Sequence, residues 1–183
     1  MEIEEKVIRR GCAMILGISI STFTLVHVVL SLVGIFAGLV VLFGMFGSKS
    51  LNGWTALFLA TTVLTSVTGF FFPFDKLLPS HIVGIVSLVV LAVAMLARYV
   101  YHLAGLWRWI YIVGAVLALY LNVFVGVVQA FQKVSSLRSL APTQSEPPFL
   151  IAQFVVLAIF IVLGISAVRL FRPHAASAVL GAA

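Results

Sequence analysis

The sequence contains little charge, because only 9% of its 183 residues are Asp, Glu, Lys or Arg. A soluble domain carries about a quarter charged residues, so this chain cannot cover itself with a water-compatible surface. Hydrophobic residues make up 63% of the sequence, and they gather in runs long enough to cross a bilayer as helices. The shortage of charge excludes a soluble globular domain and predicts an all-α integral membrane protein.

Cysteine is nearly absent, since Cys12 is the single one in the chain. This excludes an intrachain disulfide framework and a cysteine-based metal cluster. Zinc, phosphate-loop and nucleophile motifs are also missing, so we lean against an enzyme. The net charge of +6 comes from Lys and Arg placed singly or in pairs between apolar runs. That pattern is typical of membrane-edge anchors, so we expect the lipid bilayer as a partner and no nucleic acid.

Apolar runs separated by polar connectors predict a bundle of five transmembrane helices. The spans are expected at about 22–46, 54–74, 80–102, 107–131 and 149–171, which together form a transmembrane domain over 22–171. The first apolar run begins at Gly11 and is longer than one span needs, so residues 1–21 are expected to be an N-terminal extension or an interfacial segment. Residues 172–183 are expected to form a flexible tail. The Pro-containing connection 132–148 cannot be one continuous helix.

An odd number of spans places the two termini on opposite faces of the membrane. We call side A the face with the N-terminus, the turn at 74–79 and the loop at 132–148, and side B the opposite face. The 11 Lys and Arg residues divide six to side A and five to side B. Such a balance does not orient the chain by the excess of positive charge that marks cytoplasmic loops.

Polar residues inside the apolar spans lie toward side A. A polar group in hydrocarbon is costly unless it has a partner, so such residues are the first candidates for function. The candidate ligand-binding cluster consists of His27, Thr65, Thr68, His81, Asn122, Gln129 and Gln153. His27 and Asn122 share helical stripes with small residues, which mark helix contacts, so both should face the bundle. The plainer interpretation is that they are hydrogen-bonded packing residues.

Three functions are compatible with this cluster. The first is an accessory or small-ligand-binding membrane protein. The second is a membrane redox module that holds quinone, or haem b ligated by His27 and His81. His102 lies about 31 Å further along the helix from His81 and cannot share the iron. The third is a small transporter or channel, although the marks of ion-coupled carriers, such as broken spans and an inverted repeat, are missing. A homo-oligomer or a membrane-protein partner remains open.

Arg98 lies one turn from the expected end of its span. Arginines in that position extend their side chains to the lipid headgroups, and this is our expectation for Arg98. The alternative is that it contacts an anion.

Three stretches of the chain carry a resemblance to a known family. They are Trp54–Phe70 (WTALFLATTVLTSVTGF), Ala118–Val125 (ALYLNVFV) and Ala141–Phe149 (APTQSEPPF). With them, the portion from Ser21 to Phe171 resembles a family of small bacterial multi-pass inner-membrane proteins of uncharacterised activity. The resemblance implies a location in the cell inner membrane and brings no activity with it.

Overall fold

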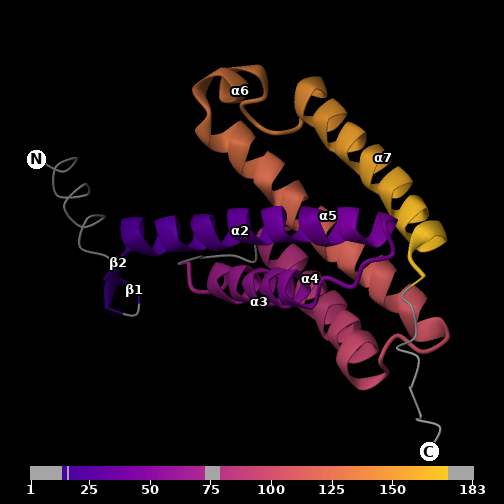
Figure 1. Ribbon diagram of the computed structural model, residues 1–183. Coiled ribbons are helices and arrows are strands. Elements are labelled where there is room, and N and C mark those ends of the chain that lie inside the picture. Colours follow the sequence, from indigo (N-terminus) through magenta and orange to yellow (C-terminus); the bar gives the residue numbers. More distant parts are fainter. Residues whose placement is uncertain (1–13, 16, 73–78, 173–183) are drawn as a thin grey trace, which may run out of the picture.

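The computed structural model describes residues 14–15, 17–72 and 79–172, and it is helical apart from one very short hairpin (Figure 1). The hairpin pairs β1 (Met14–Ile15) with β2 (Ile18–Ser19). The helices are α2 (Ile20–Phe46), α3 (Asn52–Gly69), α4 (Pro79–Met95), α5 (Leu106–Lys133), α6 (Ser135–Leu140) and α7 (Pro147–Leu170). A π-helical segment, Leu96–Val100, continues α4. The expectations for 1–13, for 73–78 and for the tail at 173–183 lie outside the described residues.

Four helices are long and apolar enough to cross a membrane, which is the pattern of a multi-pass membrane protein. They are α2, α4 with its π-helical segment, α5 and α7. At 18 residues, α3 is about 27 Å long, and Asn52, Gly53 and its threonines make it less apolar than the others. The predicted all-α membrane fold therefore agrees with the structure, but the predicted count of five spans is not confirmed.

Two predicted helix ends were wrong, and proline chemistry explains both. The second span was expected to reach residue 74, whereas α3 ends at Gly69 and a turn follows, with Phe71 N–H donating to Thr68 O at 3.2 Å. Pro73 disfavours helical backbone in the residue before it, so the chain leaves the helix early. The last span was expected from 149, but α7 begins at Pro147. Proline fits the first helical turn, where its missing N–H is not needed.

The α6 helix was not predicted, because the proline-containing loop between α5 and α7 was expected only to be broken. It occupies six residues, Ser135–Leu140, and its backbone joins α5 through the Val134 N–H, which donates to Ala130 O at 2.9 Å. Phe131, Ala141 and Phe149 form a small separate core beneath it. This core holds the start of α7 against the end of α5.

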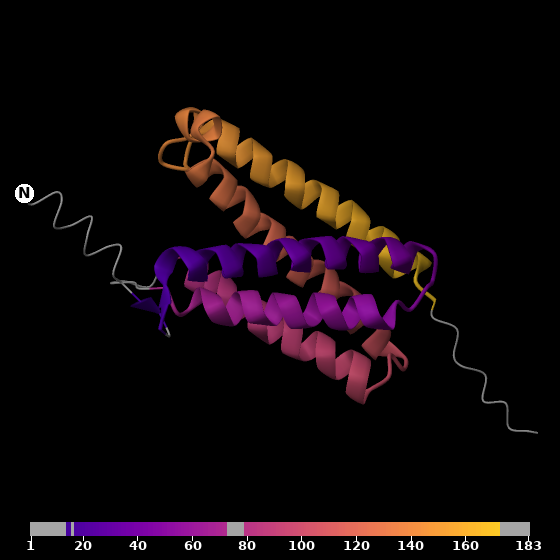
Figure 2. The same cartoon turned by 60° about the vertical axis from the view of Figure 1, so that its left-hand side comes forward.

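The helices converge at side B and diverge at side A. Helices α2 and α3 lie side by side, while α5 and α7 run obliquely to them and separate from α2 toward the end that carries α6 (Figure 2). At side B, the Ser48 hydroxyl donates to Leu170 O at 2.8 Å and accepts from Arg172 N–H at 3.1 Å. This pair of bonds attaches the end of α7 to the turn between α2 and α3.

The hydrophobic core follows the same asymmetry. On α2 the buried residues are concentrated from Gly34 to Met45, and on α5 they run from Tyr111 to Asn122, which are the side B halves of both helices. Gly38 permits a close approach of α2 to α5, because a Cβ there would lie 2.6 Å from Leu119 Cδ1. Tight packing at side B thus leaves the interior at side A less completely filled.

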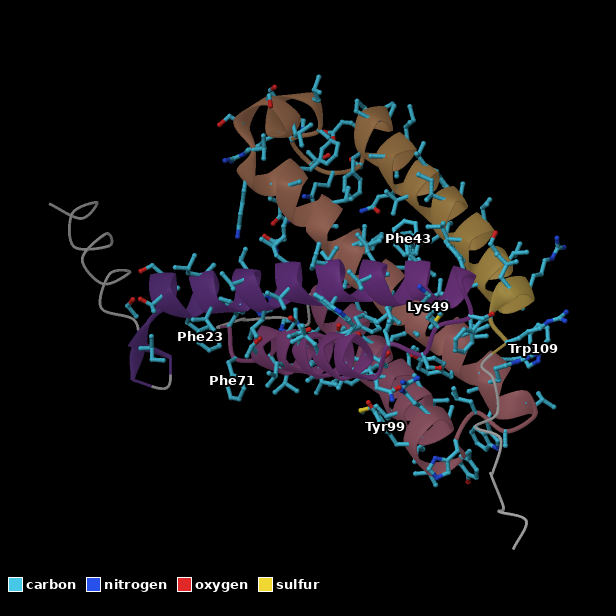
Figure 3. The ribbon with its side chains drawn as sticks, viewed as in Figure 1. Phe23, Phe43, Lys49, Phe71, Tyr99 and Trp109 are labelled. Atoms are coloured by element: carbon cyan, nitrogen blue, oxygen red, sulfur yellow. The ribbon has the colours of Figure 1, made fainter. Side chains whose placement is uncertain are left out.

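Large apolar and aromatic side chains cover the outside of the bundle. Leu25, Phe36 and Phe154 are each at least 60% exposed, which suits contact with lipid. In Figure 3, Phe23 and Phe71 lie together near the side A end, with ring centroids 6.4 Å apart, and Trp109 lies toward side B. Aromatic side chains are enriched at both membrane–water interfaces.

Candidate functional site

A cavity of about 510 Å³ occupies the side A half of the bundle, between α2, α3, α4 and α5. Most of its wall is apolar, with Leu32, Ile35 and Val125 among the lining residues. Pockets for small molecules have about 300–1,000 Å³ and a few convergent polar groups. The polar and charged lining residues are Thr24, His27, Ser31, Thr62, Thr65, Ser66, His81, Ser87, Asn122, Gln129 and Lys133. Five of the seven predicted cluster residues are therefore at one cavity.

His27 on α2 is held by Thr68 on α3, with Nδ1 and Oγ1 2.8 Å apart. The Thr68 hydroxyl also lies 2.7 Å from Leu64 O and 3.1 Å from Thr65 O, and it can donate to either carbonyl. When it does so, it accepts from the protonated Nδ1 of His27, whose other ring nitrogen is then an acceptor. Thr68 does not line the cavity, but its contact fixes the position of the His27 ring at the cavity wall. The edge of the same ring meets Phe72, with centroids 5.2 Å apart.

Two residues that line the cavity each have a buried polar atom without a hydrogen-bond partner, Thr65 Oγ1 and Asn122 Nδ2. Asn122 on α5 is only 7% exposed, and its Oδ1 accepts from Ser31 Oγ at 2.9 Å. Thr61 and Thr68 direct their hydroxyls to carbonyls of their own helix, whereas Thr65 has no such bond. A buried polar group without a partner costs about 1–3 kcal/mol, so such atoms are rare unless something else binds them.

The α4 wall of the cavity begins with His81, which is 5% exposed and lies against the ring of Phe70 at 5.7 Å. Further along α4, Ser87 Oγ accepts a hydrogen bond from the Ser66 hydroxyl of α3 at 3.3 Å, which joins the two helices. His27 and His81 thus line the same cavity from different helices. Within the described ranges, no group of three or more His, Cys, Asp or Glu side chains is gathered to hold a metal ion.

At the side A end of α5, Gln129 and Lys133 complete the lining. Among the described residues that line the cavity, Lys133 is the one Lys or Arg, and none is acidic. Gln153 lies elsewhere, although it too is near the side A end of its helix. It is 9% exposed and donates from Nε2 to Phe124 O at 3.3 Å, behind α5. The structure therefore separates Gln153 from the other predicted residues.

Sequence reasoning missed Ser66, Ser87 and Lys133 as lining residues. Lys133 was counted as a loop anchor, yet it follows Gln129 by four residues on the stripe that also carries Asn122 and Gly126. Ser87 likewise lies three residues after Gly84, another cavity-lining residue, on the same stripe of α4. Helical spacing held the signal for both positions, but only the structure shows that α5 continues as far as Lys133.

The loop before α7 is organised around Glu146, which lies outside the membrane-crossing helices. Its carboxylate accepts from the Thr143 N–H at 3.0 Å, the Thr143 hydroxyl at 2.9 Å and the Ser145 N–H at 3.1 Å. Desolvation is the largest single influence on its pKa and raises it, but the hydrogen bonds from Thr143 and Ser145 together lower the pKa below its usual value. The ionised carboxylate therefore shapes this loop.

Comparisons with protein-family models, with curated proteins and with solved structures gave no match to this chain. The family resemblance inferred from Trp54–Phe70, Ala118–Val125 and Ala141–Phe149 is not confirmed by them. The four apolar helices are consistent with a multi-pass membrane protein. The cavity is the feature of the structure that bears on its function.

Proposed function

We propose that this is a multi-pass membrane protein that binds a small lipophilic molecule with a hydrogen-bond-accepting head group in its side A cavity. The observation that carries the proposal is that two residues lining the cavity each have a buried atom without a partner, Thr65 Oγ1 and Asn122 Nδ2. Both can donate a hydrogen bond. A carbonyl or carboxylate oxygen on a bound molecule would satisfy them.

The rest of the lining supports the same class of ligand. The apolar residues Leu32, Ile35 and Val125 match a hydrocarbon or ring body. Lys133 adds a positive charge at the side A end, which favours a head group that is rich in electrons or anionic. The ligand would therefore lie with its head among the polar groups and its body along the apolar wall.

Menadione and 2-methylnaphthalene test this proposal, because they share one ring frame and only menadione has carbonyl oxygens. A ligand that binds the folded state raises the thermal midpoint of unfolding. We expect menadione to raise it and 2-methylnaphthalene to do so less, for protein in maltoside micelles. All these measurements should use a chain that carries Cys12→Ser, because quinones add covalently to thiols.

The variants Asn122→Leu and Thr65→Val should each weaken menadione binding about two- to tenfold, the value of one hydrogen bond. The matched control is Gln153→Leu, which removes another buried amide with an unpartnered atom but lies outside the cavity. The proposal would be refuted if menadione and 2-methylnaphthalene raised the unfolding midpoint equally. It would also be refuted if Gln153→Leu weakened menadione binding as much as Asn122→Leu and Thr65→Val do.

A membrane redox module that holds haem b is the second candidate, favoured by the presence of His27 and His81 at one cavity. Thr68 would fix the His27 tautomer that offers Nε2, as partners of ligating histidines commonly do. Protein purified after iron-replete expression should then show a Soret band that is lost in both His27→Ala and His81→Ala. His102→Ala is the control, since this residue lies toward side B. A spectrum without a Soret band rejects haem and leaves the first proposal standing.

We also propose that α3 is a fifth span, although it is shorter and less apolar than the other four. It lies along α2, and together the five helices would carry Ser48 and Ser136 to opposite membrane faces. Single cysteines at these two positions, in a chain without Cys12, should label from opposite sides; labelling from one side would mean that α3 does not cross. The family resemblance is the support for proposing the bacterial inner membrane as the location.

A further inference from the structure

Arg98 turns inward instead of extending to the headgroups, contrary to the expectation from its place near a helix end. It is only 9% exposed, and its Nη2 donates to Asn52 Oδ1 at 2.7 Å. Its guanidinium carbon lies 5.1 Å from the ring centre of Tyr111 and 5.8 Å from that of Tyr99. Arg98 belongs to the π-helical segment Leu96–Val100 and follows the fully buried Leu91 by seven residues, which is about two turns along the same helical face.

The charge of Arg98 is not balanced by any carboxylate in the described ranges. Glu146 is the acidic residue there, and it lies in the side A loop, where Thr143 and Ser145 bind it. Arginine cannot lose its proton in a protein. A buried charge without a counter-charge is costly, and a neutral amide such as Asn52 meets only part of the requirement.

A second pocket of about 340 Å³ opens at this arginine on side B. Its lining is Ser50, Asn52, Arg98, Tyr99, His102 and Leu103, and it contains no acidic residue. Figure 3 places Tyr99 at this end of α4. The pocket is therefore polar, electropositive and open at the level where lipid headgroups and water meet.

The start of α3 adds backbone donors beside the pocket, apart from the Asn52 N–H, which donates to Ser50 O at 3.1 Å. Leu51, at the N-cap, supplies no side-chain hydrogen bond to the helix. A Cβ built on Gly53 would meet nothing within 4 Å, so the backbone there is open to a ligand. Helix N-termini favour anions through their free N–H groups and dipole. The start of α3 would assist anion binding, but the buried charge of Arg98 is the main reason to infer a site here.

We propose that Arg98 and Asn52 form an anion site for phosphate at side B, separate from the side A cavity. The phosphate would accept hydrogen bonds from the planar guanidinium, which suits phosphate oxygens, and from the donors at the start of α3. Its source is either a phospholipid headgroup or free phosphate, and both present the same oxygens to the pocket.

Unfolding in phosphate-free maltoside micelles distinguishes these sources. The probes are inorganic phosphate, phosphatidylglycerol, and a glucosyl diacylglycerol with the same acyl chains but no phosphate. A rise in the unfolding midpoint with inorganic phosphate assigns free phosphate, and a rise with phosphatidylglycerol alone assigns the headgroup. If neither probe gives a larger rise than the glycolipid, the proposal is wrong.

Arg98→Gln should weaken binding of the effective probe about tenfold or more, as expected for loss of a charged hydrogen bond. Arg169→Gln is the matched control, because Arg169 is an exposed arginine near the same face and does not line the pocket. Equal loss in both variants would show that the effect is general surface charge, and would overturn the proposal.

Asn52→Asp keeps the test decisive if Arg98→Gln does not fold. It places a carboxylate 2.7 Å from the Arg98 guanidinium, where the amide oxygen is now. The variant should fold without phosphate, be more stable than the parent in its absence, and no longer respond to the probe. A response equal to that of the parent chain would contradict an anion site at Arg98.

Discussion

Gly38 lies where α2 crosses α3 and α5, and this close approach allows a quantitative prediction for Gly38→Ala. A Cβ at position 38 would lie 2.6 Å from Leu119 Cδ1 and 2.9 Å from two ring carbons of Phe58. Both neighbours are only 1% exposed, so they have no open space to move into. Inserting one methyl group into such a contact costs about 1–3 kcal/mol.

The gain in helix propensity partly offsets this cost, because Ala is better than Gly in a helix by about 1 kcal/mol. Gly126→Ala separates the two effects. A Cβ at 126 meets its nearest neighbour, Ile35 Cδ1, at 3.7 Å, which is ordinary contact. Gly126→Ala should therefore receive the propensity gain alone. The free energy of unfolding of Gly38→Ala should be lower than that of Gly126→Ala by about 1–3 kcal/mol.

Reversible unfolding in mixed micelles of maltoside and dodecyl sulfate measures this difference. A second measurement adds Leu119→Ala, which removes the atom closest to the new methyl group. Since the two sites are in contact, the double variant should be more stable than the sum of the single effects by about 0.5–3 kcal/mol. If Gly38→Ala and Gly126→Ala are equally stable and no coupling to Leu119 is found, the packing described at this crossing is refuted.

Three further predictions concern side chains with defined partners. Ser48→Ala should lower the free energy of unfolding by about 1 kcal/mol relative to Ser166→Ala, because Ser166 bonds only within α7. Since the pKa of Glu146 is lowered on folding, its ordering of the loop is complete above its usual pKa of 4.5 and is lost as the pH falls through the lowered value. The amide chemical shifts of the loop, followed by NMR against pH, should show this loss. The variant Glu146→Gln should remove the pH dependence. Thr68→Val should shift the Nδ1 resonance of His27, and an unchanged resonance would exclude their hydrogen bond.

The sequence was informative wherever one physical requirement dominated. Long apolar runs predicted α2, α4, α5 and α7, because a bilayer demands such runs and little else produces them. The end of α3 and the start of α7 were misplaced, since the effect of a proline depends on whether it follows a helix or opens one. Pro73 follows the end of α3, whereas Pro147 is the first residue of α7.

The candidate site was predictable in composition and less so in arrangement. Helical stripes indicated the inward faces that carry His27 and Asn122, and both residues line the cavity. Gln153 also lies toward the side A end of its helix, like the other predicted residues. That position does not determine which helix packs beside it. Because α7 packs on the outer side of α5, Gln153 meets the backbone of Phe124 instead.

The inward direction of Arg98 was also not predicted from the sequence. Its position relative to the helix end favoured extension toward the headgroups. An arginine near a helix end can instead turn inward where a neighbouring helix offers a partner, as α3 does here through Asn52. Asn52, its partner, is 46 positions away in sequence, so the pair becomes visible only when α3 and α4 are packed together.

The concentration of core packing at side B has a consequence for motion. Local opening costs least where few buried apolar contacts must break, so the cost should rise along each helix from side A toward side B. The side A ends of α5 and α7 can then fluctuate while the Ser48 bonds and the Gly38 crossing stay intact. Amide exchange should therefore be fastest beside His27 and Lys133, and partial opening there would give the proposed lipophile a lateral route from the bilayer to the cavity without global unfolding.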